Sequence, residues 1–159
     1  ISNRRYCEKV MEELSSNNEN FGIFSFDLNN LKKINDNMGH TYGDDLISGF
    51  ARILKETFEK EAVVGRMGGD EFIVIIRSDD GRIDYETFRK KLQHVIDEYN
   101  HKESRFKYSV ACGYADRTEA GDNNGNVDAR QIYSMADDRM YVHKRKIKEK
   151  MKQEKSHNE

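Results

Sequence analysis

The sequence has little cysteine, little net charge and no long hydrophobic run. Its two cysteines, Cys7 and Cys112, match no metal-binding or redox spacing, so we expect reduced thiols in a cytoplasmic protein. No apolar run approaches the roughly 18 residues of a membrane-spanning helix, and no signal-peptide pattern precedes the first expected helix. The 27 basic and 29 acidic residues nearly cancel. This balance gives no reason to expect binding to nucleic acid or to a membrane.

The composition that remains is that of one globular unit. The chain has 159 residues, of which 36% are hydrophobic, and its eight Phe and eight Tyr can fill a sizeable core. We expect a folded domain over residues 1–150 and a charged tail over residues 151–159 that frays. Because the chain starts at Ile1 and not at Met, we also expect it to be a piece of a longer protein, with an N-terminal sensor or regulatory region, or a membrane anchor, outside it.

Hydrophobic periodicity predicts the order helix, strand, two helices, hairpin, helix, strand, helix. The strands are expected at 21–28, 63–67, 72–77 and 106–115, and Asp44 is expected in or just before the first turn of a helix marked by residues 46–58. This order indicates an α+β fold with a central, mainly antiparallel or mixed sheet flanked by helices. Residues 116–128 read as a loop and not as an EF-hand, because Val127 occupies the glycine position and no Glu closes the motif.

Between two of the predicted strands lies the turn Gly68-Gly69-Asp70-Glu71. Adjacent glycines allow positive φ and leave no side chain between the backbone and an approaching ligand, so Gly68 and Gly69 are candidate substrate-binding positions. Asp70 and Glu71 offer the hard oxygen ligands that Mg²⁺ prefers, and Mg²⁺ commonly accompanies nucleotide phosphates. The turn alone leaves a plain hairpin with solvated acids open as the alternative.

A second polar cluster, from Asp27 to Asp44, favours the nucleotide interpretation. Asp27 ends an apolar strand and could share one or two cations with the acids of the turn. Lys32, about one helical turn further on, could meet phosphates bound by those cations. Asn35 and Asp44 suit the edge of a purine, since a carboxylate can accept from the N1 and N2 hydrogens of guanine. Together these groups predict a nucleoside triphosphate site.

Four motifs in this order resemble the GGDEF family of diguanylate cyclases, and the resemblance covers nearly the whole chain. They are Asn3-Arg4-Arg5, Asp27-Leu28-x-x-x-Lys32-x-Ile34-Asn35-Asp36-x-x-Gly39-His40-x-x-Gly43-Asp44, the signature Gly68-Gly69-Asp70-Glu71-Phe72, and Ala136-Asp137-x-x-Met140-Tyr141-x-x-Lys144. The resemblance implies a palm-like nucleotidyl cyclase fold and the condensation of two GTP molecules into cyclic di-GMP with release of pyrophosphate. Each domain would bind one GTP, so catalysis implies a homodimer.

The resemblance also implies the roles of the catalytic and metal-binding residues. Asp27, the backbone carbonyl of Leu28 and Asp70 would hold Mg²⁺ or Mn²⁺, two ions per half-site, with Glu71 in support. Asp70 is also the position to which the family's general-base role is assigned. Lys32 would stabilise charge on the triphosphate.

The remaining positions implied by the resemblance bind the substrate. Asn35 and Asp44 would read guanine, with His40 nearby. Lys144 and Lys148 would reach the phosphates from the last helix. Many relatives have a Gly-Arg pair where this chain has Ile147-Lys148, which weakens the case for Lys148.

One departure from the family concerns inhibition by the product. Many members carry an Arg-x-x-Asp motif that binds cyclic di-GMP, and the corresponding positions here are Glu59 and Ala62. We therefore expect no product inhibition through that site. Two alternatives to an active cyclase also remain open, namely a non-catalytic GTP-binding or regulatory module and a cyclase that makes a mixed or adenine-containing dinucleotide.

Overall fold

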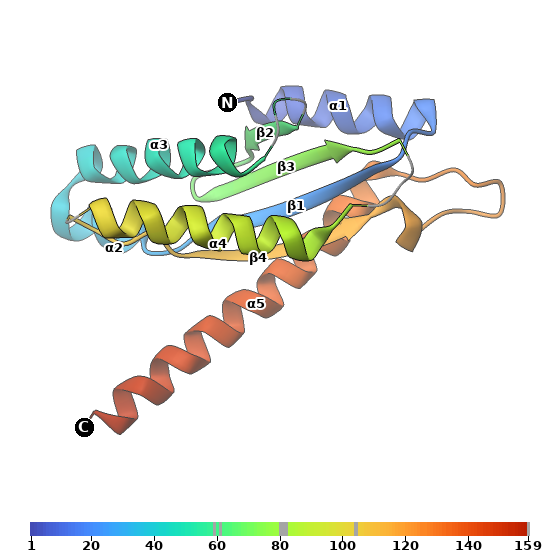
Figure 1. The fold of residues 1–159 in the computed structure, drawn as a ribbon. Coiled ribbons are helices and arrows are strands. Elements are labelled where there is room, and N and C mark those ends of the chain that lie inside the picture. Colours follow the sequence, from blue (N-terminus) through green and yellow to red (C-terminus); the bar gives the residue numbers. More distant parts are fainter. Residues whose placement is uncertain (59, 61, 80–82, 104, 159) are drawn as a thin grey trace.

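The computed structural model describes residues 1–58, 60, 62–79, 83–103 and 105–158, and Figure 1 shows one sheet covered by helices. The elements are α1 (Arg4–Asn17), β1 (Phe21–Leu28), α2 (Leu31–Met38), α3 (His40–Thr57), β2 (Val63–Arg66), β3 (Glu71–Arg77), α4 (Tyr85–Lys102), β4 (Val110–Asp116), the short 3₁₀ helix η1 (Arg117–Glu119) and α5 (Ala129–His157). The predicted order of helices and strands is confirmed, with η1 as an addition. No helix in the described part of the chain is both long and apolar enough to cross a membrane.

The sheet has the strand order β2-β3-β1-β4, and all three pairings between strands are antiparallel. This confirms the expected mainly antiparallel sheet. The central strand β1 pairs with β3 on one side and β4 on the other, and all eight of its residues are buried. Asp27, near its end, lies opposite Glu71 of β3. The register therefore brings the two acidic clusters of the sequence to the same end of the sheet.

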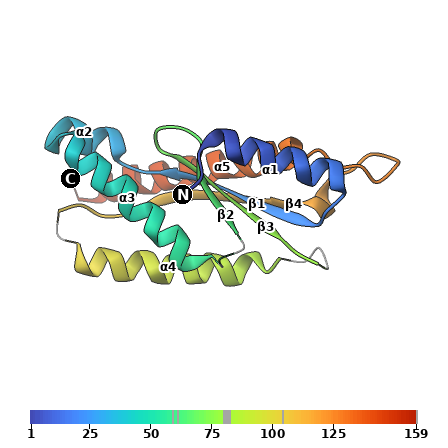
Figure 2. The ribbon, with the colours of Figure 1, turned by 90° about the horizontal axis from the view of Figure 1, so that it is seen from above.

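Alternating side chains of the strands fill two separate cores. Phe24, Phe26 and Phe72 belong to the core under α3 and α4. Ile23 and Ile73 belong to the core under α1 and α5. Successive strand residues point to opposite faces, which explains the division. In Figure 2 the strands accordingly run between α4 on one side and α1 on the other.

Two expected element boundaries are wrong. The helix predicted over residues 46–58 begins at His40, because Gly39, with φ +96°, is the only residue between α2 and α3. Asp44 thus lies in the second turn. The strand predicted from residue 106 begins at Val110. Before it, the Asn100 side chain accepts from the Tyr108 N–H at 2.6 Å and donates to the Tyr108 carbonyl at 2.9 Å. The Asn100 side chain thus forms the two backbone hydrogen bonds at Tyr108 that a neighbouring strand would otherwise form.

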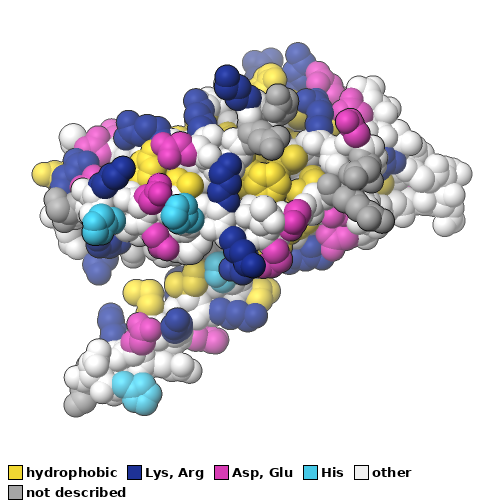
Figure 3. Space-filling model, in the orientation of Figure 1, with side chains coloured by type: hydrophobic (Ala, Val, Ile, Leu, Met, Phe, Trp, Pro, Cys, Tyr) yellow, Lys and Arg dark blue, Asp and Glu magenta, His cyan; other side chains and the backbone are white. Residues whose placement is uncertain are grey.

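The last helix extends beyond the rest of the molecule. Its first part packs on the sheet, and its C-terminal part projects away (Figure 1) and carries side chains of both charges (Figure 3). Residues 151–157 continue this helix with exposed side chains. The fraying expected for residues 151–159 therefore stays a prediction about how often this helix end opens. Glu59, which carries part of the expectation about product inhibition, lies outside the described residues.

Candidate active site

Asp27 is the most deeply buried acid of the candidate site, with 3% of its surface exposed. Its Oδ2 accepts a hydrogen bond from Lys144 Nζ of α5 at 2.9 Å. Its Oδ1 is also buried and has no hydrogen-bond partner. A buried carboxylate oxygen without a donor is costly, so this atom fits the coordination of a cation. The same ion pair raises the pKa of the Lys144 ammonium group.

The signature turn lies beside Asp27 because β3 pairs with β1. The Leu28 N–H donates to the Asp70 carbonyl at 2.8 Å, which extends the pairing of the two strands by one bond. Burial, and then the charge of Asp27, raise the pKa of the Asp70 carboxyl group. Burial, and then the charge of Asp137, raise the pKa of Glu71. Several acidic groups thus share one end of the sheet, an arrangement that a bound cation would stabilise.

The two glycines of the turn do not use the positive φ that glycine allows, and their role in substrate binding stays a prediction. Neither Gly68 nor Gly69 has a positive φ. A Cβ atom at Gly69 would meet no heavy atom within 4 Å, so the tip of the turn is open. The Arg66 guanidinium holds the turn by donating to the carbonyls of Gly68 at 3.1 Å and Gly69 at 2.8 Å. Sequence reasoning assigned no role to Arg66, although a guanidinium two residues before a glycine pair is well placed to bind the carbonyls of the turn.

A cleft of about 660 Å³ opens between the end of β1, α2 and α5. Six of the predicted site residues line it, namely Asp27, Leu28, Lys32, Asp70, Lys144 and Lys148. Lys32 and Lys148 form no ion pair with any residue that the structure describes. Two unpaired ammonium groups near two carboxylates suit a ligand that carries phosphates and a divalent cation.

The structure does not bring all the predicted residues to this cleft. Asn35, His40 and Asp44 lie where α2 meets α3, outside its lining, as do Glu71 and the two glycines of the turn. His40 and Asp44 are exposed, and Asn35 is half-buried. A ligand that contacts both groups must therefore extend from the cleft along α2, as a nucleotide could with its phosphates at one end and its base at the other.

The corner between α2 and α3 is held by a residue that the sequence did not reveal. Arg105 donates to Asp45 Oδ2 at 2.7 Å, and its guanidinium carbon lies 5.4 Å from the centre of the Tyr42 ring. Asp45 and Tyr42 flank the Gly43-Asp44 pair on α3. Because Arg105 lies about 60 residues away from them in the chain, no local pattern could have identified this support.

Asp137 is a second residue whose contacts the sequence did not predict. Its Oδ1 accepts a hydrogen bond from the Ser25 hydroxyl at 2.9 Å, and Ser25 precedes Asp27 by two residues on the same face of β1. Sequence analysis recognised Asp137 only as part of a motif. The contact attaches α5 to β1 beside the ion pair of Lys144 and Asp27, so one helix face carries both contacts.

The donor atoms fit a metal that is held jointly by protein and ligand. Among the described residues, no three His, Cys, Asp or Glu side chains are grouped so that they alone could hold a metal ion. Asp27, Asp70 and the carbonyl of Leu28 supply two carboxylates and one backbone oxygen at the edge of the cleft. Mg²⁺ is commonly bound through one or two carboxylates together with substrate phosphates, which matches this donor set.

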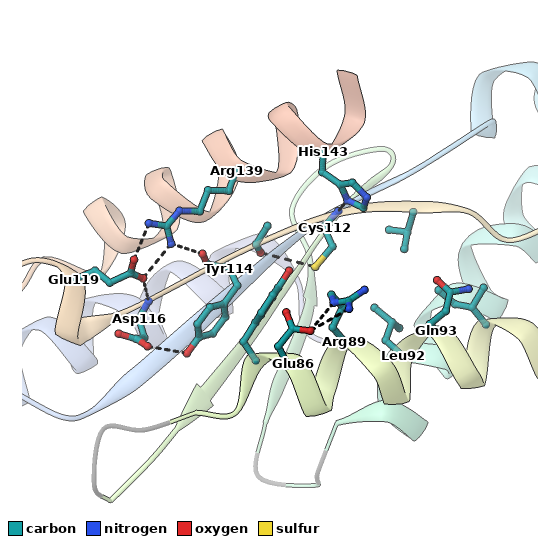
Figure 4. A pocket seen from close by; sticks show the side chains of 14 residues that line it. Glu86, Arg89, Leu92, Gln93, Cys112, Tyr114, Asp116, Glu119, Arg139 and His143 are labelled. Carbon is teal, nitrogen blue, oxygen red and sulfur yellow. Dashed lines mark hydrogen bonds and ion pairs between the residues drawn. The ribbon is translucent and has the colours of Figure 1, made fainter. Parts of the chain in front are cut away.

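A second cleft, of about 700 Å³, lies between α4, β4 and α5 and is shown in Figure 4. Its charged groups pair with one another. Arg139 binds Glu119 at 2.7 Å, and Arg89 binds Glu86 at 3.0 Å. Because the guanidinium groups of Arg139 and Arg89 are already paired with carboxylates, the cleft near Asp27, with its two unpaired lysines, is the better candidate for a nucleoside triphosphate site.

The fold, with acids at the end of β1 and the start of β3, defines a protein of the palm-like nucleotidyl cyclase class. A sequence model described as "Diguanylate cyclase, GGDEF domain" matches residues 1–150. The chain therefore belongs to the GGDEF family of diguanylate cyclases, which are nucleotidyltransferases, as the four motifs predicted.

Curated relatives and solved structures agree with this assignment. The chain is 31% identical over 157 residues to the signaling protein YkoW of Bacillus subtilis, a match that covers 94% of this chain and 19% of YkoW. It is 26% identical over 145 residues to the diguanylate cyclase DgcS of Shewanella oneidensis, covering 89% of this chain and 46% of DgcS. The chain thus spans less than half the length of these relatives.

A solved structure of similar fold is that of the coiled coil and GGDEF domain of DgcB from Caulobacter crescentus, in complex with c-di-GMP. It matches with a TM-score of 0.72 at 20% sequence identity and covers 91% of this chain and 77% of the DgcB chain. At this identity the similarity shows the fold, and it confirms the predicted palm-like architecture.

Proposed function

We propose that this domain condenses two GTP molecules into cyclic di-GMP and two pyrophosphates, as part of a homodimer. The observation that carries the proposal is the buried Oδ1 of Asp27, which has no hydrogen-bond partner and lies at a cleft lined by Asp70, Lys32 and Lys148. A nucleoside triphosphate with its divalent cation would provide a cation for this oxygen and phosphate oxygens for the unpaired lysines.

Asp27, Asp70 and the carbonyl of Leu28 would hold Mg²⁺ or Mn²⁺, two ions per half-site, with Glu71 in support. These ions would lower the pKa of the attacking 3′-hydroxyl and neutralise charge that develops on the phosphates. Asp70 lines the cleft beside Asp27, where its carboxylate would accept the proton of the attacking hydroxyl. We assign Asp70 the role of general base.

In the reaction, the 3′-oxygen of one GTP forms a bond to the α-phosphorus of the other. The bond from that phosphorus to the oxygen bridging to the β-phosphate breaks, and pyrophosphate leaves with the electron pair. Lys32, Lys144 and Lys148 would bind phosphate oxygens and stabilise the leaving group. A second attack, by the 3′-oxygen of the other nucleotide on the α-phosphorus of the first, closes the ring and releases the second pyrophosphate.

At the other end of the substrate, Asn35 and Asp44 would bind the guanine base, with His40 and the open backbone of Gly68 and Gly69 nearby. The carboxylate of Asp44 can accept from the N1 and N2 hydrogens of guanine, which adenine does not present in the same pattern. This chemistry supports GTP over ATP as the substrate.

The two reciprocal attacks require two bound GTP molecules facing each other, so we propose that a second copy of the domain faces the cleft with twofold symmetry. GTP and the free cysteines suit the cytoplasm. Because the chain spans only part of its relatives' length, a regulatory or sensor region in the full protein belongs to this proposal as well.

The test is to incubate the purified domain with GTP, ATP and Mg²⁺ and to identify the products by chromatography and mass. We expect cyclic di-GMP from wild type and none from Asp70→Ala or Glu71→Ala. A version fused to a dimeric coiled coil controls for weak dimerisation, because a monomer could be inactive through dilution alone. GTP binding without turnover in the fused dimer would favour the non-catalytic module, and a mixed dinucleotide would favour altered base choice.

A further inference from the structure

The two residues proposed to bind guanine are connected by an unusually close contact at Gly43. Gly43 is a buried residue in the first turns of α3, and Asn35 lies on α2. A Cβ atom at Gly43 would overlap the Oδ1 of Asn35 and would lie 2.8 Å from its Cγ. The side-chain amide of Asn35 therefore rests directly on the backbone of Gly43, in the space that any other residue would fill.

Helix stability alone does not explain this glycine. Gly43 lies within a helix and has no positive φ, so its backbone conformation is open to every residue. Glycine in a helix interior is less favourable than alanine. An alanine would thus stabilise α3 locally, and the three heavy atoms nearest to its Cβ would all belong to the Asn35 amide. That amide is the end of a flexible side chain, which can rotate away.

Nothing else among the described residues fixes the Asn35 amide. No described residue donates a hydrogen bond to it or accepts one from it, so packing against Gly43 determines where it points. Asp44 follows Gly43 directly and is exposed. The backbone at Gly43 consequently sets the position of the amide relative to the carboxylate.

We propose that Gly43 is a positioning residue for guanine recognition, acting through Asn35. The inference rests on the proposed function. Because Gly43 has no side chain, the Asn35 amide can lie beside Asp44, so that an amide and a carboxylate contact one purine edge together. A methyl group at residue 43 would displace the amide, so that the hydrogen bonds of Asn35 to the purine edge would be lost or misaligned.

The test compares wild type, Gly43→Ala, Asn35→Ala and the double variant by calorimetry with 3′-deoxy-GTP and Mg²⁺. This analogue binds through its base and phosphates but lacks the attacking hydroxyl. We expect Gly43→Ala to weaken binding at least about 10-fold while its melting temperature stays the same or rises. In the Asn35→Ala background the same change should have no further effect on affinity. Ser48→Ala, at an exposed position of α3, is the control and should bind as wild type does.

Turnover of GTP adds a readout that a purely structural role would not move. Gly43→Ala should raise KM at least about 10-fold and leave kcat within about threefold, because the base lies away from the reacting atoms. Wild-type affinity in Gly43→Ala, or equal losses in both backgrounds, would overturn the inference while the proposed function stands. Failure of wild type itself to bind the analogue would overturn the proposed function and this inference with it.

Discussion

At the scale of single residues, the pair of Asp27 and Lys144 leaves one buried carboxylate oxygen free for the cation that we propose. Lys144 neutralises one oxygen of the buried carboxylate and leaves the other without a partner. A lysine can withdraw along its flexible chain, whereas a buried arginine would bind both oxygens in a fixed fork. The ion pair therefore stabilises the folded domain without a ligand and leaves Oδ1 of Asp27 able to bind one.

We predict that Lys144→Met destabilises the metal-free domain by about 1–3 kcal/mol, because it leaves the Asp27 charge buried without its partner. Mg²⁺ should recover more stability in this variant than in wild type, since the ion no longer competes with Lys144. Thermal melting with Mg²⁺ and with EDTA measures both effects. Lys146→Met removes a neighbouring exposed lysine and should leave the Mg²⁺ shift unchanged. Equal shifts in Lys144→Met and wild type would contradict the prediction.

The sequence predicted six residues that the structure brings to one cleft, but not how the site is supported. Asp27, Asp70 and Lys32 stand in local motifs whose spacing is visible in the chain. Arg105 and the contact of Gly43 with Asn35 depend on how distant segments, or two successive helices, pack in space. The signature glycines do not use the positive φ that glycine allows, and the Arg66 guanidinium and the strand pairing hold that turn.

At the scale of elements, the close approach of α5 to β4 at Gly113 determines how the last helix crosses the sheet. A Cβ atom there would overlap the carbonyl oxygen of Ala136 and the nitrogen of Met140, and would lie 2.9 Å from the carbonyl carbon of Arg139. These are backbone atoms, which cannot rotate away. The helix could accommodate a side chain only by moving off the strand.

Gly113→Ala should therefore lower the free energy of unfolding by about 1–3 kcal/mol or more. Urea denaturation followed by circular dichroism measures the change. Gly121→Ala provides the control, because a Cβ atom there would make ordinary contacts, the nearest at 3.5 Å. Similar stabilities for the two variants would show that α5 can shift without cost.

The outer edge of β4 is covered by side chains of α5. His143 Nδ1 accepts from the Cys112 N–H at 2.9 Å, and Arg139 donates to the Tyr114 carbonyl at 2.6 Å (Figure 4). Burial, and the nearby charges of Lys146 and Arg89, lower the pKa of His143 below its ordinary value. Protonation at Nδ1 would also remove the atom that accepts the hydrogen bond.

This lowered pKa predicts a pH-dependent stability. Between the lowered pKa of folded His143 and its ordinary value near 6.5, the unfolded chain binds more protons than the folded one. The contribution of His143 is thus present above about pH 6.5 and is lost as the pH falls below it. Melting temperatures of wild type should drop more between pH 7 and pH 5 than those of His143→Ala. His94→Ala, at an exposed position of α4, should follow wild type.

Strongly periodic elements were predicted well, because buried faces repeat along them. The predicted start of the strand at residue 106 was wrong because a side chain, and not a neighbouring strand, forms the backbone hydrogen bonds there. Asn100 bonds both backbone groups of Tyr108, so buried residues that look like part of a strand precede β4 without belonging to it. Hydrophobic periodicity records burial, and it cannot show which group takes the backbone hydrogen bonds.

At the scale of the whole molecule, Glu59 and Ala62 stand at the two positions where the family resemblance would place the Arg-x-x-Asp motif that binds the product. We predict that cyclic di-GMP at tens of micromolar leaves the initial rate of GTP turnover unchanged. Ala62, and Glu59 in place of the family's arginine, provide no pair that could bind the product's guanine and phosphate. Clear inhibition, with dimeric product bound beside Glu59, would refute the prediction.

Near the start of the chain, Ser2 forms an isolated parallel β-bridge with Gly65 of the edge strand β2. The Ser2 N–H donates to the Val64 carbonyl at 2.9 Å, and the Arg66 N–H donates to the Ser2 carbonyl at 3.0 Å. Arg66 in turn holds the carbonyls of Gly68 and Gly69. Ser2 and the signature turn are therefore joined through one residue, Arg66, whose backbone N–H binds Ser2 and whose guanidinium binds the turn. A displacement of Ser2 would act directly on the residue that holds the turn closed.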